Sequence, residues 1–196
     1  MKNKGLLILG GLVILLLILG SFSYNNFVKL GEDTNAKWAQ VTTQYQRRYD
    51  LIPNLVATVQ GVAKQEKDVF VGIAEARAKV GQVTLSKEAL SDPQALKNFN
   101  DAQGQLGVMV SRLLSVAEQY PQLKSNENFS SLQKEIEGTE NRIAVARKDF
   151  NDVVQTYNTK VKTFPGMLFA KIFGFDVRPY FELQQNGAEV APTVKF

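Results

Sequence analysis

The most conspicuous pattern in the chain is an uninterrupted apolar stretch at its start. Residues 5–28 contain no charged residue, and most positions up to Leu19 are aliphatic. About 20 apolar residues, each rising about 1.5 Å along a helix, cross the roughly 30 Å hydrocarbon core of a bilayer. Because lipid offers no hydrogen-bond partners, the backbone there must satisfy itself. The pattern therefore predicts a transmembrane helix.

A cleaved secretory signal is the alternative, since Lys2 and Lys4 precede the stretch and Ser21-Phe22-Ser23 resembles a small-residue cleavage site. The apolar run is longer than the usual signal core of about 7–15 residues, which favours an uncleaved anchor. Tyr24 and Phe27 stand where interfacial aromatic residues belong. The lysines beside the N-terminal end place that end in the cytoplasm and the rest of the chain outside.

Beyond the anchor, apolar residues recur at alternating steps of three and four. Such seams occupy residues 38–62, 96–120 and 129–161. This spacing is typical of helices packed side by side. Pro121 and Pro165 follow the second and third seams, and proline does not continue a helix. The pattern predicts an all-α fold, in which the transmembrane helix leads into an antiparallel up-and-down helix bundle.

Pro53 lies inside the first seam. Proline in a helix removes one hydrogen bond and kinks or ends the helix. The seam keeps its register across Pro53, so we expect one long helix, kinked there, that ends near Val80-Gly81. A break, with a tight turn over residues 51–54, is the alternative.

A second short apolar segment follows the bundle. Residues 167–175 contain one lysine and are too few to span a bilayer. The simpler interpretation is packing over the end of the bundle, and the alternative is a segment lying on the membrane surface. The predicted organisation is a tail and transmembrane helix (1–28), a bundle (29–164), this short apolar segment (165–183) and a disordered tail (184–196).

The composition excludes many kinds of chemistry. The chain contains no cysteine and no histidine. Thiol nucleophiles, disulfides and thiolate zinc sites are therefore impossible, and the commonest general base and metal ligand is missing. The net charge of +4 falls to +2 without Lys2 and Lys4, and no run of Lys or Arg exceeds two residues, so a nucleic-acid surface is not indicated. We expect no catalytic site, no cofactor and no metal.

One group of polar residues stands out as a structural or interaction cluster. Its members are Arg47, Arg48, Asp50, Asn54, Glu118, Glu140, Asn141 and Arg142. Arg48 falls on the seam, so we expect it to be partly buried and paired with Glu140 or Glu118 across the bundle. An anion site at Arg47-Arg48 is the alternative, although adjacent helical residues diverge by about 100°. A metal site built on glutamates is disfavoured because such bundle sites also use histidine.

Several motifs resemble those of the bacterial LemA family. They are Tyr24-Asn25-Asn26-Phe27-Val28, Trp38, Tyr45-Gln46-Arg47-Arg48-Tyr49-Asp50-Leu51-Ile52-Pro53-Asn54-Leu55-Val56, Glu66, Ala76-Arg77-Ala78, Glu118-Gln119-Tyr120-Pro121-Gln122-Leu123-Lys124, Leu132-Gln133, Gly138-Thr139-Glu140-Asn141-Arg142-Ile143, Arg147, Tyr157-Asn158 and Phe164-Pro165. The match extends to about Phe181. The resemblance implies one membrane helix and a four-helix bundle in the bacterial inner membrane. A relative in magnetosome formation suggests a role in membrane organisation.

The leading hypothesis is a non-enzymatic, membrane-anchored bundle of the cell envelope. Its expected partners are the lipid bilayer and other membrane or envelope proteins, or a second copy in a homo-oligomer. An extracytoplasmic ligand-sensing bundle is the alternative, and it needs a pocket lined by Arg47, Arg48 and Tyr49. A carboxylate-based enzyme is a third hypothesis.

Overall fold

The computed structural model describes residues 2–83 and 88–181, and every described regular element is helical. Four long helices form the body of the molecule: α1 (Lys2–Gln60), α2 (Lys67–Gln82), α3 (Pro93–Glu118) and α5 (Glu127–Lys162). Two short α-helices, α4 (Pro121–Lys124) and α6 (Gly166–Phe173), and a 3₁₀ turn at Glu88–Ser91 complete it. The predicted all-α class is confirmed, with six α-helices where four were expected. The predicted disordered tail (184–196) lies outside the described residues.

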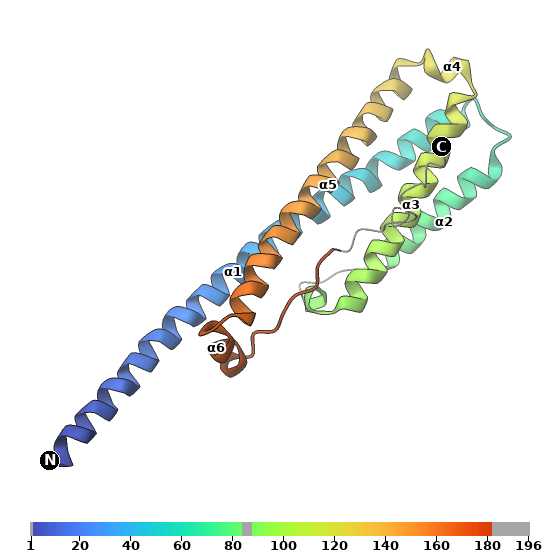
Figure 1. The fold of residues 1–196 in the computed structure, drawn as a ribbon. Coiled ribbons are helices and arrows are strands. Elements are labelled where there is room, and N and C mark those ends of the chain that lie inside the picture. The colour runs from blue at the N-terminus through green and yellow to red at the C-terminus, as the bar shows by residue number, and fades with distance from the viewer. Residues whose placement is uncertain (1, 84–87, 182–196) are drawn as a thin grey trace, which may run out of the picture.

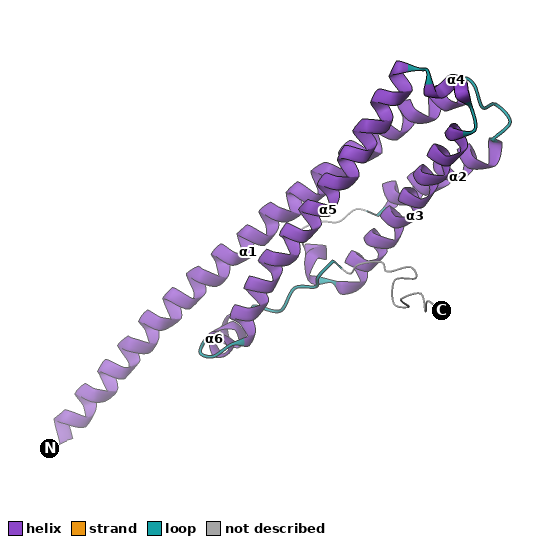
Figure 2. Ribbon diagram, turned by 45° about the horizontal axis from the view of Figure 1, so that its top comes forward, coloured by secondary structure: helices purple, strands orange, loops and turns teal. Residues whose placement is uncertain are grey.

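The long helices run alternately up and down. Helix α5 lies antiparallel along α1, and α2 lies antiparallel along α3, so that the bundle consists of two helix pairs (Figures 1 and 2). Helix α4 crosses the end of the bundle between α3 and α5, and α6 lies at the opposite end beside α1 (Figure 1). This arrangement is the up-and-down bundle that the apolar seams predict.

Helix α1 is much longer than its partners, and its N-terminal part projects beyond the bundle (Figure 1). The side chains from Ile8 to Leu19 are all exposed, and burial begins at Gly20. By length and composition, α1 is one helix that can cross a membrane. Its projecting part coincides with the predicted anchor, and Ser21-Phe22-Ser23 lies within the continuous helix.

The helix continues through Pro53, as predicted, but it does not extend to Val80-Gly81. Helix α1 continues through Pro53 to Gln60, and the chain then reverses before α2 begins at Lys67. The helix expected to end near Val80-Gly81 is therefore two helices. Pro53 is exposed, while Ile52 and Leu55 beside it are fully buried, so tertiary packing maintains the helix despite the lost hydrogen bond.

Two helix starts follow directly from local sequence. Asp92 caps α3 by accepting a hydrogen bond from the backbone N–H of Gln94 at 2.9 Å, with Pro93 in the first helical position. Asn126 caps α5 by accepting from the N–H of Phe129 at 3.1 Å. Both side chains satisfy amides that a helix start leaves unpaired, so these ends can be predicted from sequence.

The core divides into three clusters along the bundle. The distal cluster includes Ile52, Leu55, Leu106, Leu113 and Phe129. The middle cluster includes Trp38, Tyr45, Phe99, Phe150 and Phe181. The proximal cluster, nearest the projecting part of α1, consists of Phe27, Tyr157, Val161 and Ala170. Most of these residues lie within the ranges of the predicted seams, the exceptions being Phe27, Ala170 and Phe181.

Candidate functional site

A polar layer, formed by Arg48, Gln103, Thr139 and Glu140, interrupts the apolar core. The Arg48 side chain is only 4% exposed. Its Nη1 donates to the Glu140 carboxylate, 3.0 Å from Oε1 and 3.3 Å from Oε2. Its Nη2 donates to the backbone carbonyl of Gln103 at 2.9 Å and to the side-chain oxygen of the same residue. The layer thus connects α1, α3 and α5 through one guanidinium group.

The Arg48 guanidinium lies over the ring of Tyr45, 5.1 Å from its centroid, and the buried Thr139 precedes Glu140 on α5. The Thr139 hydroxyl donates to the carbonyl of Glu135 at 2.7 Å, and it accepts from Nη2 of Arg142 at 2.8 Å. Burial raises the pKa of Tyr45, and the charges of Arg147 and Arg48 partly oppose that shift. The phenol therefore stays neutral at physiological pH. The Nη1 and Nη2 groups of Arg48 are hydrogen-bonded, whereas its buried Nε has no hydrogen-bond partner in the described part of the chain. The surroundings of Arg48 are those of a structural layer.

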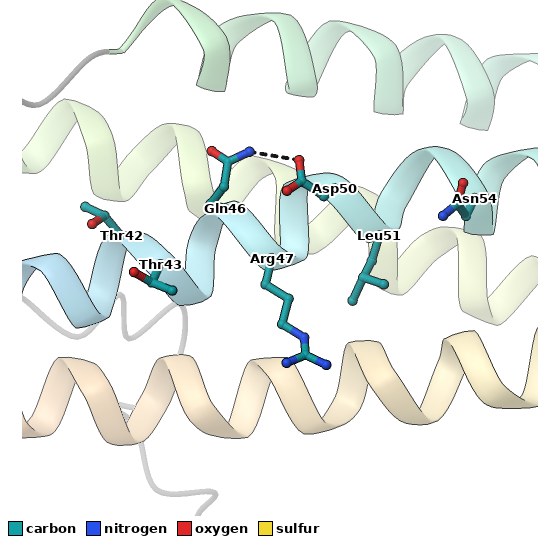
Figure 3. Close-up of a pocket in the computed structure, with 7 residues that line it drawn as sticks. All are labelled: Thr42, Thr43, Gln46, Arg47, Asp50, Leu51 and Asn54. Carbon is teal, nitrogen blue, oxygen red and sulfur yellow. Dashed lines mark hydrogen bonds between the residues drawn. The ribbon is translucent and has the colours of Figure 1, made fainter.

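The outward side of α1, close to the same layer, carries an open depression, which we call the α1 depression (Figure 3). Its lining residues are Thr42, Thr43, Gln46, Arg47, Asp50, Leu51 and Asn54. Gln46 donates to the Asp50 carboxylate at 2.8 Å, and Arg47 extends towards α5 in Figure 3. The lining of the α1 depression can form hydrogen bonds and ion pairs with a partner, because it contains amides, hydroxyls, one cation and one anion. Without a base positioned at a nucleophile, they do not form a recognisable catalytic arrangement.

Arg47, Arg48 and Tyr49 have three separate surroundings. Arg47 lines the α1 depression, and Arg48 is buried in the polar layer. The ring of Tyr49 is covered by the guanidinium of Arg77 from α2, 4.3 Å from the ring centroid. The pocket that the ligand-sensing hypothesis needs, lined by all three side chains, is not found in the described part of the chain.

The remaining members of the predicted cluster lie apart from one another. Asn141 and Arg142 border a surface depression between α1 and α5, where Arg142 Nε donates to the side-chain oxygen of Gln44 at 3.2 Å. Glu118 is exposed at the end of α3, so it is Glu140 that faces Arg48. Over the described residues, no three His, Cys, Asp or Glu side chains converge in an arrangement that could hold a metal ion.

Two asparagines of α5, Asn151 and Asn158, bind the backbone of the segment after α6. Asn158 accepts from the N–H of Arg178 and donates to its carbonyl, both at 2.8 Å. Asn151 makes the same pair of bonds with Phe181, at 2.9 and 3.0 Å. The two asparagines are seven residues apart and therefore lie on one side of the helix, and this spacing can be seen in the sequence. Their bonds place Phe181 against Trp38, with ring centroids 5.6 Å apart.

The end of the bundle nearest the projecting part of α1 is a second region where side chains converge. Helix α6 packs against α1 around Gly20 and Tyr24, and the ring of Phe173 meets that of Tyr24 edge-on at 5.3 Å between centroids. Phe175 packs on Phe27 at 4.9 Å. The short apolar segment therefore packs on the end of the bundle, which is one of the two positions considered for it.

Comparisons with known proteins agree with this architecture. The family model described as the LemA family matches residues 37–196. Two proteins of Paramagnetospirillum magneticum, named magnetosome proteins MamQ 1 and MamQ 2, are each 30% identical to the chain over 180 residues. The magnetosome protein MamQ of Magnetospirillum gryphiswaldense is equally similar. Each match covers 84% of this chain, and the chain spans 66% of the length of each relative.

Proposed function

Because the chain belongs to the LemA family, we propose that it is a membrane-anchored, non-enzymatic bundle of the bacterial cell envelope that acts by contact with other proteins. The continuity of α1 carries this proposal. One 59-residue helix includes both the apolar anchor and one wall of the bundle, with no linker between them. A continuous helix fixes the direction in which the bundle leaves the membrane, whereas a flexible linker would not.

The α1 depression is the surface that we propose for the contact. It lies on the helix that carries the anchor, so its distance from the bilayer is set by the rise of that helix. Its lining combines Arg47 and Asp50 with amide and hydroxyl groups, which suits an interface of hydrogen bonds and ion pairs. The name of the MamQ relatives, magnetosome protein, is consistent with a role at a membrane.

Photo-crosslinking in living cells tests the contact. A photoreactive amino acid is placed at Gln46, which lines the α1 depression, and, as a control, at Ser111, which is exposed on α3. We expect discrete adducts with an envelope protein from position 46 and none from position 111. Absence of adducts at Gln46, or equal adducts at both positions, would contradict the proposed surface. Adducts only with a second copy of this chain would replace it with a homo-oligomer.

We further propose that the N-terminus is cytoplasmic and that the bundle lies outside the inner membrane. The lysines at positions 2 and 4 support this orientation. Since the chain has no cysteine, a single Cys in place of the exposed Glu135 can be labelled selectively. A membrane-impermeant maleimide should label it in intact cells. Labelling only after the cells are lysed would reverse the proposed topology.

A further inference from the structure

Helix α6 presents an apolar face to its surroundings. Ile172 is 72% exposed, Leu168 51% and Met167 49%. Leu168 and Ile172 are four residues apart and therefore lie one above the other on the same side of the helix. The opposite side, with Gly166 and Ala170, is buried. Helix α6 therefore has one face packed on the protein and one apolar face without a covering element among the described residues.

The position of α6 along α1 matches the end of the membrane span. Counting about 20 residues from Gly5, the hydrocarbon core ends near Tyr24. Helix α6 packs beside this part of α1, and an apolar groove runs between the two helices. The groove is lined by Val13, Leu16, Leu17, Gly20, Ser21, Tyr24 and Asn25 of α1 and by Phe169, Ile172 and Phe173 of α6. The exposed face of α6 is thus level with the outer edge of the bilayer.

Contacts at both ends of α6 hold it in this position. At its start, Gly166 lies against the backbone of Lys160 and the ring of Phe27, where there is no room for a side chain. Beyond its end, Phe175 packs on Phe27, and the Arg178 backbone is bound by an asparagine of α5. The apolar side chains of α6 are therefore held outward by the packing of the helix rather than left there by a loose connection.

We propose that α6 is inserted in the outer part of the bilayer, so that its exposed face and the groove beside α1 contact phospholipid acyl chains. The groove is continuous with the exposed apolar surface of residues 8–19, which faces lipid if α1 spans the membrane. Lys171 is exposed between the apolar side chains, and its long side chain can reach the phosphate groups of the lipid. This proposal does not depend on any protein partner.

Spin labelling of the full chain in lipid tests the proposal. The absence of native cysteine allows single-site labelling of Ile172→Cys, of Leu16→Cys in the span and of Val145→Cys on the outer side of α5. Each variant is placed in vesicles of equal parts phosphatidylethanolamine and phosphatidylglycerol. Power saturation then compares collisions with oxygen, which concentrates in lipid, and with a water-soluble nickel chelate. All three positions are exposed, so the labels should not disturb folding, and Trp38 fluorescence checks this.

We expect the oxygen-to-nickel collision ratio at position 172 to be several-fold above that at position 145, and below that at position 16, which lies deeper in the bilayer. A ratio at position 172 equal to that at position 145 would place α6 in water and overturn the proposal. Low collision with both reagents would mean that protein, such as a second copy, covers the face, and would also overturn it. The measurement needs no partner, so its outcome is separate from that of the crosslinking experiment.

Discussion

Removing the carboxylate that faces Arg48 tests whether the polar layer stabilises the bundle. Glu140→Ala deletes the acceptor of the two Nη1 contacts, at 3.0 and 3.3 Å, and leaves the buried guanidinium with Gln103 as its remaining acceptor. Breaking a fully buried ion pair costs about 3–5 kcal/mol, and a hydrogen bond to a charged group contributes about 1.5–3 kcal/mol.

The expected loss is smaller than that for a fully buried pair because the Glu140 side chain is 42% exposed. Water can reach the vacated position and partly solvate the guanidinium. We therefore expect Glu140→Ala to lower the free energy of unfolding by about 1–3 kcal/mol. For a chain of this length that corresponds to a fall of roughly 2–12 °C in Tm.

Urea unfolding of the full chain in detergent micelles measures the loss. Trp38 is the only tryptophan, and it is buried in the middle cluster against Phe99, Phe150 and Phe181, so its fluorescence reports unfolding of the core. The matched control is Glu135→Ala, which removes an exposed carboxylate from the same helix and should change stability by at most about 0.5 kcal/mol.

A double-mutant cycle separates the ion pair from other effects. Arg48→Met removes the buried charge but keeps an unbranched side chain, although it leaves the Gln103 acceptors without their donor. In the Arg48→Met background, Glu140→Ala should cost little, because no unpaired charge remains. Equal losses from Glu140→Ala and Glu135→Ala, or the same loss with and without Arg48, would refute the reasoning.

Three further predictions concern the pH dependence of stability at Asp149, the helix at Pro53 and the packing of α6 at Gly166. Lys37 lowers the pKa of the Asp149 carboxyl below its ordinary value of 3.8, mainly through its hydrogen bond and secondly through its positive charge. This contact stabilises the fold above pH 3.8 and is lost as the pH falls through the lowered pKa. Asp149→Asn should therefore destabilise the chain at neutral pH and not in strong acid, and a pH-independent difference between the urea midpoints would count against this. Pro53→Ala restores a helical N–H and should raise the free energy of unfolding by about 1–3 kcal/mol; a loss of stability would show that the proline is needed. Gly166→Ala places a methyl group against the Lys160 carbonyl and should cost roughly 1–3 kcal/mol. It should also speed proteolysis within α6, and an unchanged digestion rate would contradict the close packing.

The position of the first chain reversal shows where a sequence pattern fails. Val62, in the connection after α1, and Val69 of α2 are seven residues apart, so the apolar spacing continues in register across the connection. The apolar periodicity indicates which side of each helix is buried, and α1 and α2 both bury that side in the same core. It does not record whether the chain has turned around. Pro53 was the strongest local breaker, but the buried residues on either side of it keep the helix intact.

The sequence by itself determined the anchor, the helical class and the main buried positions, because each depends on the order of apolar and polar residues within one segment. It also indicated that Arg48 would need a partner, since a charge on an apolar seam is costly to bury alone. The tertiary structure decided that this partner is Glu140, that the Arg48 guanidinium also bonds to Gln103, and that Asn151 and Asn158 hold the last described segment. It also decided that α6 packs against α1 around Gly20 and Tyr24. These outcomes depend on which helices become neighbours and at what height, and that is fixed only when all the helices pack together.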